Sequence, residues 1–577
     1  GAFFNSISMT LYATSAALML TAWLTPLHFL PWISWHSEAW AFAAMVIGFA
    51  NVCFEKFRGS GNAIAIPLAA WPFLGLSAVV VAQFFAGQIN YFGDAIVLLF
   101  YMAVCIGSLA TGFNLACRDS ESHLPLRQQR NILEWSACLL LVGALSSAVI
   151  ALIQVLNVWS DAEWILRMPA LRRPGGNLAQ PNQLATLILF GIVSLVYLFE
   201  RRHVTALVAV PAAVVLVIGV ATTESRTGGM SLLLVSLWWV AKYRALDFKL
   251  RPPVLGAWIA LSLLLLWFWP TLFNTVQISG MTAIGDATVS TATGTRPVVW
   301  LQLWDAALQR PWFGWGLREV STAHNSVLGT QSLAEPFTYA HNVVLDLAVG
   351  MGLPLTFLLV IAGCAWFYRR ATMVQDLTSW YCIALILPFG IHSLLEFPFA
   401  YAYLLAPIMF SVGILESRVA PFAVLRAPLR LTVVVSAAIV FVAVWSVFEY
   451  ISIEEDFRVA RFEALHVGQT PADYQRPRIH LLTQLDALLN VARVVPIPSM
   501  PIETIEEVRQ VAMRFPWTAT QNRYALSLAL NGNSEEALRQ LNIMRAMHEA
   551  AAYARIKAQW ETLAEEKYPQ LRNLKLP

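Results

Sequence analysis

Long apolar runs dominate the first 448 residues of this 577-residue chain. The runs at 132–158 and 254–270 are about long enough to cross a hydrocarbon core ~30 Å thick as helices. They lack the alternation of hydrophobic and polar positions that marks a strand of an outer-membrane barrel. The pattern therefore predicts an all-α polytopic membrane helix bundle. Hydrophobic windows place about thirteen transmembrane helices near residues 9–24, 39–54, 63–85, 95–116, 132–158, 183–199, 204–221, 229–240, 254–270, 342–367, 378–391, 401–415 and 431–448.

One long polar interruption, residues 271–340, separates two of these spans. It contains no lysine, but it holds Arg296, Arg310, Arg318 and His324 and ends against His341. A loop of this length inside a compact protein is usually functional, and arginine and histidine near a membrane are costly unless they serve a purpose. We therefore expect this loop to take part in chemistry.

The distribution of basic residues predicts the orientation. With a cytoplasmic N-terminus, the cytoplasmic loops carry sixteen lysines and arginines and the opposite loops carry seven, which satisfies the positive-inside rule. All seven outer charges are arginines, whose planar guanidinium suits phosphate oxygens. An odd number of spans then places loop 271–340 and the C-terminal tail on the outer face, which in a bacterial inner membrane is the periplasm.

The tail, residues 449–577, differs in composition from the rest. It holds 16 of the 35 acidic and 15 of the 38 basic residues, whereas the whole chain is 58% hydrophobic and 13% charged. This contrast predicts a membrane domain at 1–448 and a soluble α-helical domain at 449–577. Residues 522–548 have the pattern of a helix, a turn and a second helix, as in a tetratricopeptide-like scaffold for protein contacts.

Five polar clusters fall at the outer ends of predicted spans. They are RRPGGNLAQPNQLA at 172–185, TESRTGG at 223–229, GTRPVVW at 294–300, the start of AHNVVLDLAVGMGLPL at 340–355, and HSLLEFPFAYAY at 392–403. Taken singly, each has a bland reading as an interfacial anchor, a helix cap or part of the aromatic belt. Together on one face they offer arginine for phosphates, amides for a polar substrate and histidine as a general base. His324 and His341 both lie in AHN triplets, so local sequence leaves the base open between them.

These motifs, with QFFAGQINYFGDA at 83–95, resemble the PglL-type O-oligosaccharyltransferases, relatives of the WaaL O-antigen ligases and Wzy polymerases. The resemblance covers roughly residues 1–448 and extends to a C-terminal helical extension of the kind that PglL-type members carry. It implies transfer of a glycan from undecaprenyl pyrophosphate to an acceptor hydroxyl at the periplasmic face. The favoured acceptor is a Ser or Thr of an exported protein such as pilin.

The resemblance also implies residue roles. Arg226 and Arg296 match the arginines that bind the pyrophosphate, His341 matches the catalytic histidine and Gln180 matches a functional glutamine. The corresponding tyrosine is Tyr403 or, as the alternative, Tyr401. Further polar groups for the substrate are expected from Asn182, His392, Glu396 and His324. Abstraction of the acceptor proton by His341 predicts direct displacement with inversion, and the outer loops hold no DxD-type carboxylate cluster, so we expect a reaction without metal or cofactor.

Three other functions fit parts of the pattern. An O-antigen ligase or polymerase would use a sugar hydroxyl, such as that of lipid A core, although the extra span and the tail favour a protein acceptor. A lipid or sugar transporter should show ionisable residues within spans or an internal repeat. A scaffold would leave the arginines and His341 unexplained. The net charge of +3 is small and gives no reason to expect binding to nucleic acid.

Overall fold

The computed structural model describes residues 2–59, 61–117, 126–159, 161–167, 173–276, 296–329, 334–419 and 424–577. Helices make up nearly all of the regular structure in these ranges, which confirms the predicted all-α membrane fold. The chain forms two compact units. The first comprises Gly1–Leu76, Phe100–Ile284 and Ala362–Val442, and the second comprises Ser77–Leu99, Gly285–Ile361 and Ala443–Pro577.

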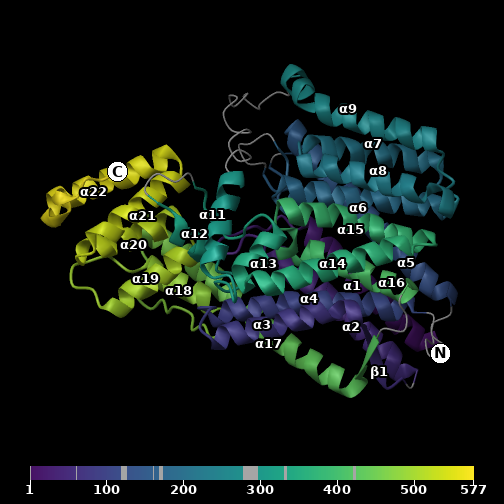
Figure 1. The fold of residues 1–577 in the computed structure, drawn as a ribbon, viewed down its shortest axis with the longest axis horizontal. Helices are drawn as coiled ribbons and strands as arrows, with labels where there is room; N and C mark the ends of the chain where they lie inside the picture. Colours follow the sequence, from purple (N-terminus) through teal and green to yellow (C-terminus); the bar gives the residue numbers. More distant parts are fainter. Residues whose placement is uncertain are drawn as a thin grey trace. The chain divides into compact units, whose positions relative to one another are not determined.

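The first unit is a helix bundle in which α6 and α15 are largely buried. Helices α6 to α9 lie side by side within it (Figure 1). Its helices are α1 (Ala2–Leu24), α2 (Trp35–Arg58), α5 (Leu126–Leu156), α6 (Pro181–Glu200), α7 (Ala206–Thr222), α8 (Arg226–Leu246), α9 (Pro252–Val276), α15 (Leu377–Leu395) and α16 (Ala402–Val419), with short 3-10 turns η1 (Leu68–Ala70), η2 (Gly176–Leu178) and η3 (Pro398–Ala400). Strand β1 (Ala63–Pro67) pairs antiparallel with β2 (Val424–Pro428), and Ala63 lies opposite Pro428.

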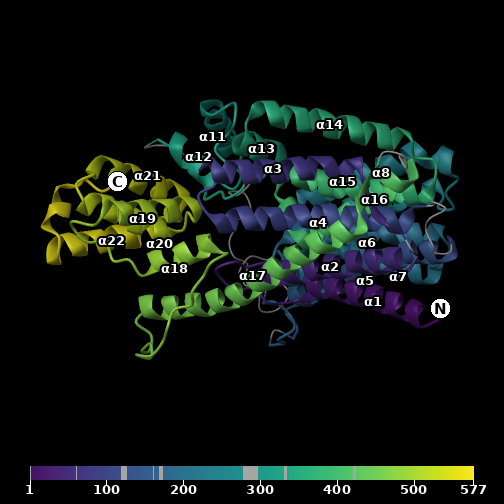
Figure 2. The ribbon, with the colours of Figure 1, turned by 90° about the horizontal axis from the view of Figure 1, so that it is seen from below.

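Four helices contribute residues to both units: α3 (Trp71–Phe85), α4 (Phe92–Ala116), α14 (Leu353–Thr372) and α17 (Leu429–Ala464). The other helices of the second unit are α11 (Arg296–Gln309), α12 (Val320–Val327), α13 (Val343–Met351), α18 (Thr483–Ala492), α19 (Ile502–Arg514), α20 (Thr518–Leu530), α21 (Ser534–Met547) and α22 (Ala550–Glu566), followed by η4 (Pro569–Asn573). Figure 2 shows the helices of the tail gathered together, with α20 packed on both α19 and α21. The predicted helical hairpin at 522–548 corresponds to α20 and α21.

Every predicted transmembrane window falls on a helix. Among the described residues, ten helical segments are long and apolar enough to cross a membrane: Ser6–Leu24, Trp35–Arg58, Leu68–Phe85, Phe92–Ala116, Ile132–Leu156, Pro181–Glu200, Pro252–Phe273, Leu353–Thr372, Leu377–Leu395 and Leu429–Ala464. The remaining three windows correspond to α7, which is a shorter apolar helix, and to α8 and α16. The chain is therefore a multi-pass membrane protein.

The structure corrects four details of the sequence prediction. The segment predicted as one helix at 342–367 is two helices, because Gly352 has a φ of 89° and a Cβ there would lie 2.4 Å from the Trp312 carbonyl oxygen. The predicted helix at 63–85 begins as strand β1 instead. Helix α17 continues beyond 448 to Ala464. The polar interruption at 271–340 holds α11 and α12 in its described part.

Helices α11, α12 and α13 share one small hydrophobic core in the second unit. Val299 and Leu303 of α11, Val320 of α12 and Val349 of α13 are almost fully buried there. The same core encloses Ala340, the residue before His341. The AHN triplet at 340–342, which contains His341, therefore begins inside this packed core.

Candidate functional site

Helix α6 begins at the predicted QPN element. Gln180 has an extended backbone, and its side-chain oxygen accepts a hydrogen bond from Gln183 N at 2.8 Å, which makes it the N-cap. Pro181 occupies the first helical position, where its missing N–H costs nothing. The bend before it is tight, because Ala179 has a φ of 63°. The glycines, prolines and amides of this motif thus build a helix start that presents polar side chains.

Asn182 joins three helix ends in the first unit. Its Oδ1 accepts hydrogen bonds from Ser225 Oγ at 2.8 Å and from Arg173 Nη2 at 3.4 Å. Its Nδ2 donates to Glu396 Oε1 at 3.0 Å, just beyond the C-terminus of α15. Asn182 therefore connects the starts of α6 and α8 with the end of α15.

Arg226 is the first residue of α8, and its side chain is exposed. Ser225 caps this helix by accepting from Gly228 N at 3.1 Å while its hydroxyl donates to Asn182. A helix N-terminus carries a partial positive charge from its backbone dipoles, so a guanidinium here adds to a site already suited to an anion.

The HSLLEFPFAYAY segment lies against α6. His392 is buried, and its Nδ1 lies 2.8 Å from Thr186 Oγ1. The Tyr403 hydroxyl donates to Gln183 Oε1. The backbone oxygen of Tyr403 accepts from Trp23 Nε1. Tyr403 is almost fully buried, whereas Tyr401 is half-buried, with ring centroids 5.4 Å apart. The first unit thus gathers seven predicted site residues around the N-terminus of α6: Gln180, Asn182, Arg226, His392, Glu396, Tyr401 and Tyr403.

The second unit contains the other three predicted residues. Arg296 is the first described residue of α11 and is half-buried. His324 lies on α12 with no exposed surface, and its Nε2 lies 2.8 Å from Gln302 Oε1. Burial lowers the pKa of His324 to about 4, so the imidazole is neutral over ordinary pH values.

His341 differs from His324 in exposure and backbone. It is half-buried and has a φ of 55°, in the left-handed region that residues other than glycine rarely adopt. Its ring stacks on Phe337 at 4.4 Å between centroids. The next residue, Asn342, caps α13 by accepting from Val344 N at 3.0 Å and Leu345 N at 3.1 Å. Strained backbone next to a helix start is a frequent feature of functional sites.

Comparison with known proteins gives three family matches that follow one another along the chain. Residues 174–199 match a family described as protein glycosylation ligase, and residues 211–360 match O-antigen ligase. Residues 380–562 match the C-terminal part of a virulence factor membrane-bound polymerase.

Two curated relatives come from Acinetobacter baylyi (strain ATCC 33305 / BD413 / ADP1). The general O-oligosaccharyltransferase is 25% identical over 552 residues, which are 92% of each chain. The ComP-specific O-oligosaccharyltransferase is 25% identical over 358 residues, or 62% of each chain. The chain is thus similar to O-oligosaccharyltransferases, and it contains segments that match the protein glycosylation ligase and O-antigen ligase families. It is therefore a glycosyltransferase.

Each candidate site residue falls within one of these three family segments. Gln180 and Asn182 fall in the protein glycosylation ligase segment. The O-antigen ligase segment holds the two candidate arginines and both candidate histidines, Arg226, Arg296, His324 and His341. The polymerase segment holds the remaining candidates, His392, Glu396, Tyr401 and Tyr403, and continues into the tail.

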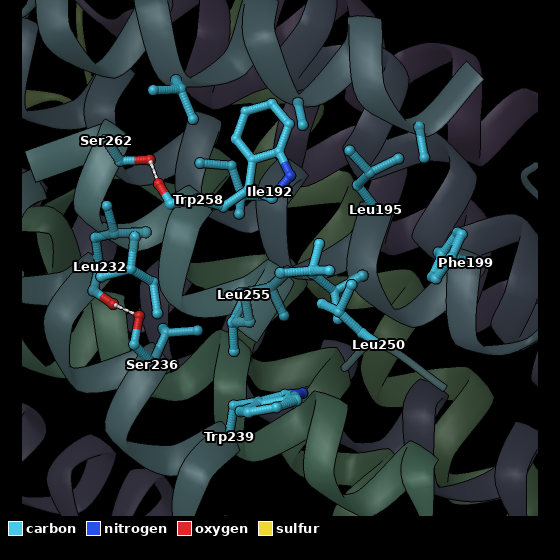
Figure 3. Close-up of a pocket in the computed structure, with 18 of the residues that line it drawn as sticks. Ile192, Leu195, Phe199, Leu232, Ser236, Trp239, Leu250, Leu255, Trp258 and Ser262 are labelled. Carbon is cyan, nitrogen blue, oxygen red and sulfur yellow. Dashed lines mark hydrogen bonds between the residues drawn. The ribbon is translucent and has the colours of Figure 1, made fainter. Parts of the chain in front are cut away.

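A cavity of about 220 Å³ lies among α6, α7, α8 and α9 (Figure 3), and none of these candidate residues lines it. Its two serines are satisfied within their own helices, since Ser262 Oγ donates to the Trp258 carbonyl and Ser236 Oγ to the Leu232 carbonyl (Figure 3). Apart from three tryptophan indoles, the remaining lining is apolar. A glycan carries many hydroxyl groups and would find few hydrogen-bond partners there, so the cavity is better suited to hydrocarbon.

Sequence reasoning missed several residues that organise the site. Arg173 and Ser225, which bond to Asn182, lie within motifs that were recognised for other residues. Trp300 and Asp346, which contact the backbone beside His341, lie within quoted motifs but received no role. The signal was their place in the motif: Ser225 precedes Arg226, and Trp300 follows Arg296 by about one helical turn.

Proposed function

We propose that this enzyme transfers a glycan from undecaprenyl pyrophosphate to a Ser or Thr hydroxyl of an exported protein such as pilin, at the periplasmic face of the bacterial inner membrane. The observation that carries the proposal is the similarity to a general O-oligosaccharyltransferase along 92% of both chains. The protein glycosylation ligase match over Gln180 and Asn182 supports a protein acceptor.

Arg226 and Arg296 are proposed to bind the pyrophosphate. Each begins a helix in the described part of the chain, α8 in the first unit and α11 in the second. Charge-assisted hydrogen bonds from guanidinium groups strengthen as negative charge develops on the leaving pyrophosphate. Because pyrophosphate is already a good leaving group, stabilising this charge supplies much of the catalysis required.

His341 is proposed as the general base. A base must reach a substrate proton, and His341 is half-buried whereas His324 has no exposed surface. Burial also holds the pKa of His324 near 4, which makes it a weak base at neutral pH. His341 would take the hydroxyl proton while the oxygen attacks the anomeric carbon and the pyrophosphate departs, giving inversion. His324 then has a structural role through Gln302.

The substrate is proposed to contact a group of polar side chains in the first unit. They are Gln180, Asn182, His392, Glu396, Tyr401 and Tyr403. The exposures of Tyr401 and Tyr403 differ, so Tyr401 is the better candidate for direct contact and Tyr403 supports α6 through Gln183.

The test offers two acceptors to the purified enzyme. Labelled lipid-linked glycan is mixed with pilin and with lipid A core, separately and in competition, using wild type and His341→Ala. Label on pilin that disappears in the variant supports the proposal. Label on lipid A core alone would assign the enzyme as an O-antigen ligase, the function that the 211–360 match favours as the alternative. Loss of activity with EDTA would contradict the expected independence from metal.

A further inference from the structure

The residue before His341 is held at both of its backbone polar atoms. Ala340 N donates to Asp346 Oδ2 at 2.9 Å, and Ala340 O accepts from Trp300 Nε1 at 2.7 Å. Ala340 itself has no exposed surface. A buried backbone group loses about 1–3 kcal/mol if it is left unpaired, so both contacts matter at this position.

The carbonyl of Ala340 belongs to the peptide plane that precedes His341, and the orientation of that plane defines φ of His341. A left-handed φ of 55° costs about 1–2 kcal/mol for a residue with a Cβ and persists only where neighbouring contacts impose it. The indole of Trp300 fixes this plane directly. The stacking of Phe337 on the imidazole then acts on a ring whose backbone is already oriented.

The two holding residues come from different helices. Trp300 lies four residues after Arg296 on α11, so both lie on the same face of that helix. Asp346 lies in the first turn of α13, where its own N–H donates to Asn342 O at 2.9 Å. Helix α13 is not one of the ten candidate membrane spans. Burial of the Asp346 carboxyl raises its pKa to about 7. The turn at His341 is thus tied to both the helix that begins with Arg296 and the helix that follows it.

We propose that Trp300 and Asp346 are positioning residues that clamp the Ala340 backbone and thereby aim His341 for proton abstraction. The inference rests on the proposed role of His341 as base. The clamp also links the donor-binding helix α11 to the base, because the residue that holds the turn lies one helical turn from Arg296. A displacement of about 1 Å at a reacting group can cost about 100-fold in rate, so a single lost contact here should be visible in kcat.

The test compares two tryptophans that make the same kind of bond. Trp300→Phe removes the indole N–H and keeps an aromatic ring. Trp315→Phe is the matched control, because Trp315 Nε1 donates to the Ala306 carbonyl at 2.8 Å in the same unit, and this bond does not involve Ala340. We expect Trp300→Phe to lower kcat by about tenfold or more with KM for donor and acceptor unchanged, and Trp315→Phe to change kcat by less than about twofold. Equal kcat losses in the two variants, or a loss that appears only in KM, would overturn the clamp.

Asp346 provides an independent test that survives poor folding of the tryptophan variant. Asp346→Asn keeps an oxygen that can accept from Ala340 N, whereas Asp346→Ala removes it. We expect the asparagine to restore most of the kcat that the alanine loses, at similar unfolding temperatures. Equal loss in both variants would overturn a role for this acceptor. His341→Ala, assayed alongside, separates the two levels: full activity there refutes the proposed base, whereas an inactive His341→Ala with unimpaired Trp300 and Asp346 variants refutes only the clamp.

Discussion

Asn182 connects three polar side chains of the first unit. Its amide bonds to Ser225, Arg173 and Glu396 at once, so replacing it removes three contacts together. Turn chemistry made Gln180 and Asn182 readable from the sequence, since glycine, proline and amides before an apolar run indicate a capped helix. The local pattern could not reveal that α8 begins and α15 ends at the same place, because that depends on long-range packing.

Asn182→Ala should lower activity by about tenfold or more, because hydrogen bonds to charged groups contribute about 1.5–3 kcal/mol. The loss should be seen mainly as weaker donor binding, since Ser225 caps the helix that starts with Arg226. Asn114 is a suitable control, because it is buried in the same unit and bonds to the backbone of Ala65 and Ala110. Asn114→Ala should reduce the unfolding temperature without a selective change in donor KM. Similar kinetics for the Asn182→Ala and Asn114→Ala variants would argue against a role of Asn182 in donor binding.

His324 gives a prediction about pH at the same scale. Its pKa is about 4 in the folded protein, against 6.5 for an unperturbed histidine, so below pH 6.5 the unfolded chain takes up a proton that the folded protein does not. Stability from this residue is therefore present above pH 6.5 and is lost as pH falls towards 4, by up to about 3 kcal/mol. Wild type should lose more thermal stability than His324→Gln between pH 6.5 and 4.5. Parallel melting curves for the two proteins over this range would show that His324 is not held neutral.

At the scale of helices, the sequence predicted which segments contain helices better than it predicted where those helices begin and end. Every apolar window contains a helix, because a long hydrophobic run has few other stable states in a bilayer. The break at Gly352 was missed because the apolar run continues through it, although Pro354 lies in the first turn of α14 and is typical of a new helix start. Strand β1 was missed because its partner β2 is more than 350 residues away.

Helix α19 of the tail makes the contact whose loss should be most costly. Arg514 donates through Nε and Nη2 to the two oxygens of Asp94 at 2.8 and 2.7 Å, and both side chains are buried. Arg514→Ala would remove this bidentate partner from the Asp94 carboxylate and should cost about 3–5 kcal/mol. The double variant with Asp94→Ala should recover part of that loss. Thermal unfolding in detergent measures both.

The same helix offers a control in Arg509, which pairs with Glu506 at 2.6 Å but is much more exposed. Exposed ion pairs contribute about 0–1 kcal/mol, so Arg509→Ala should hardly change the unfolding temperature. An Arg514→Ala protein as stable as Arg509→Ala would mean that the buried pair does not secure the tail in the folded enzyme.

At the scale of the whole molecule, the composition of residues 449–577 indicated a separate domain. The structure groups these residues into one compact unit with 77–99 and 285–361, and a single family segment spans 380–562 across the predicted boundary. Composition could not predict this grouping, because it averages over segments and carries no record of which distant segments pack together.

Orientation belongs to this scale and follows from the predicted odd number of spans. Alkaline phosphatase folds into an active form only in the periplasm. Phosphatase fused after the tail should therefore be active, and phosphatase fused in the loop that carries Arg201 and Arg202 should be inactive. Green fluorescent protein at the same positions should give the reverse pattern. An inactive phosphatase at the tail with an active one at the Arg201 loop would invert the proposed topology and move the candidate site to the cytoplasmic face.

In the proposed reaction, transfer of the glycan to the protein releases the lipid carrier, and both products can be measured in one reaction mixture. Purified enzyme is incubated with undecaprenyl-pyrophosphate glycan and a Ser-containing pilin, and the glycan gained by intact pilin is compared with the undecaprenyl pyrophosphate released. We expect one glycan on the protein for each undecaprenyl pyrophosphate released, and neither product with His341→Ala. Pyrophosphate release without glycan on the protein, or unchanged yields in the variant, would contradict the proposed reaction.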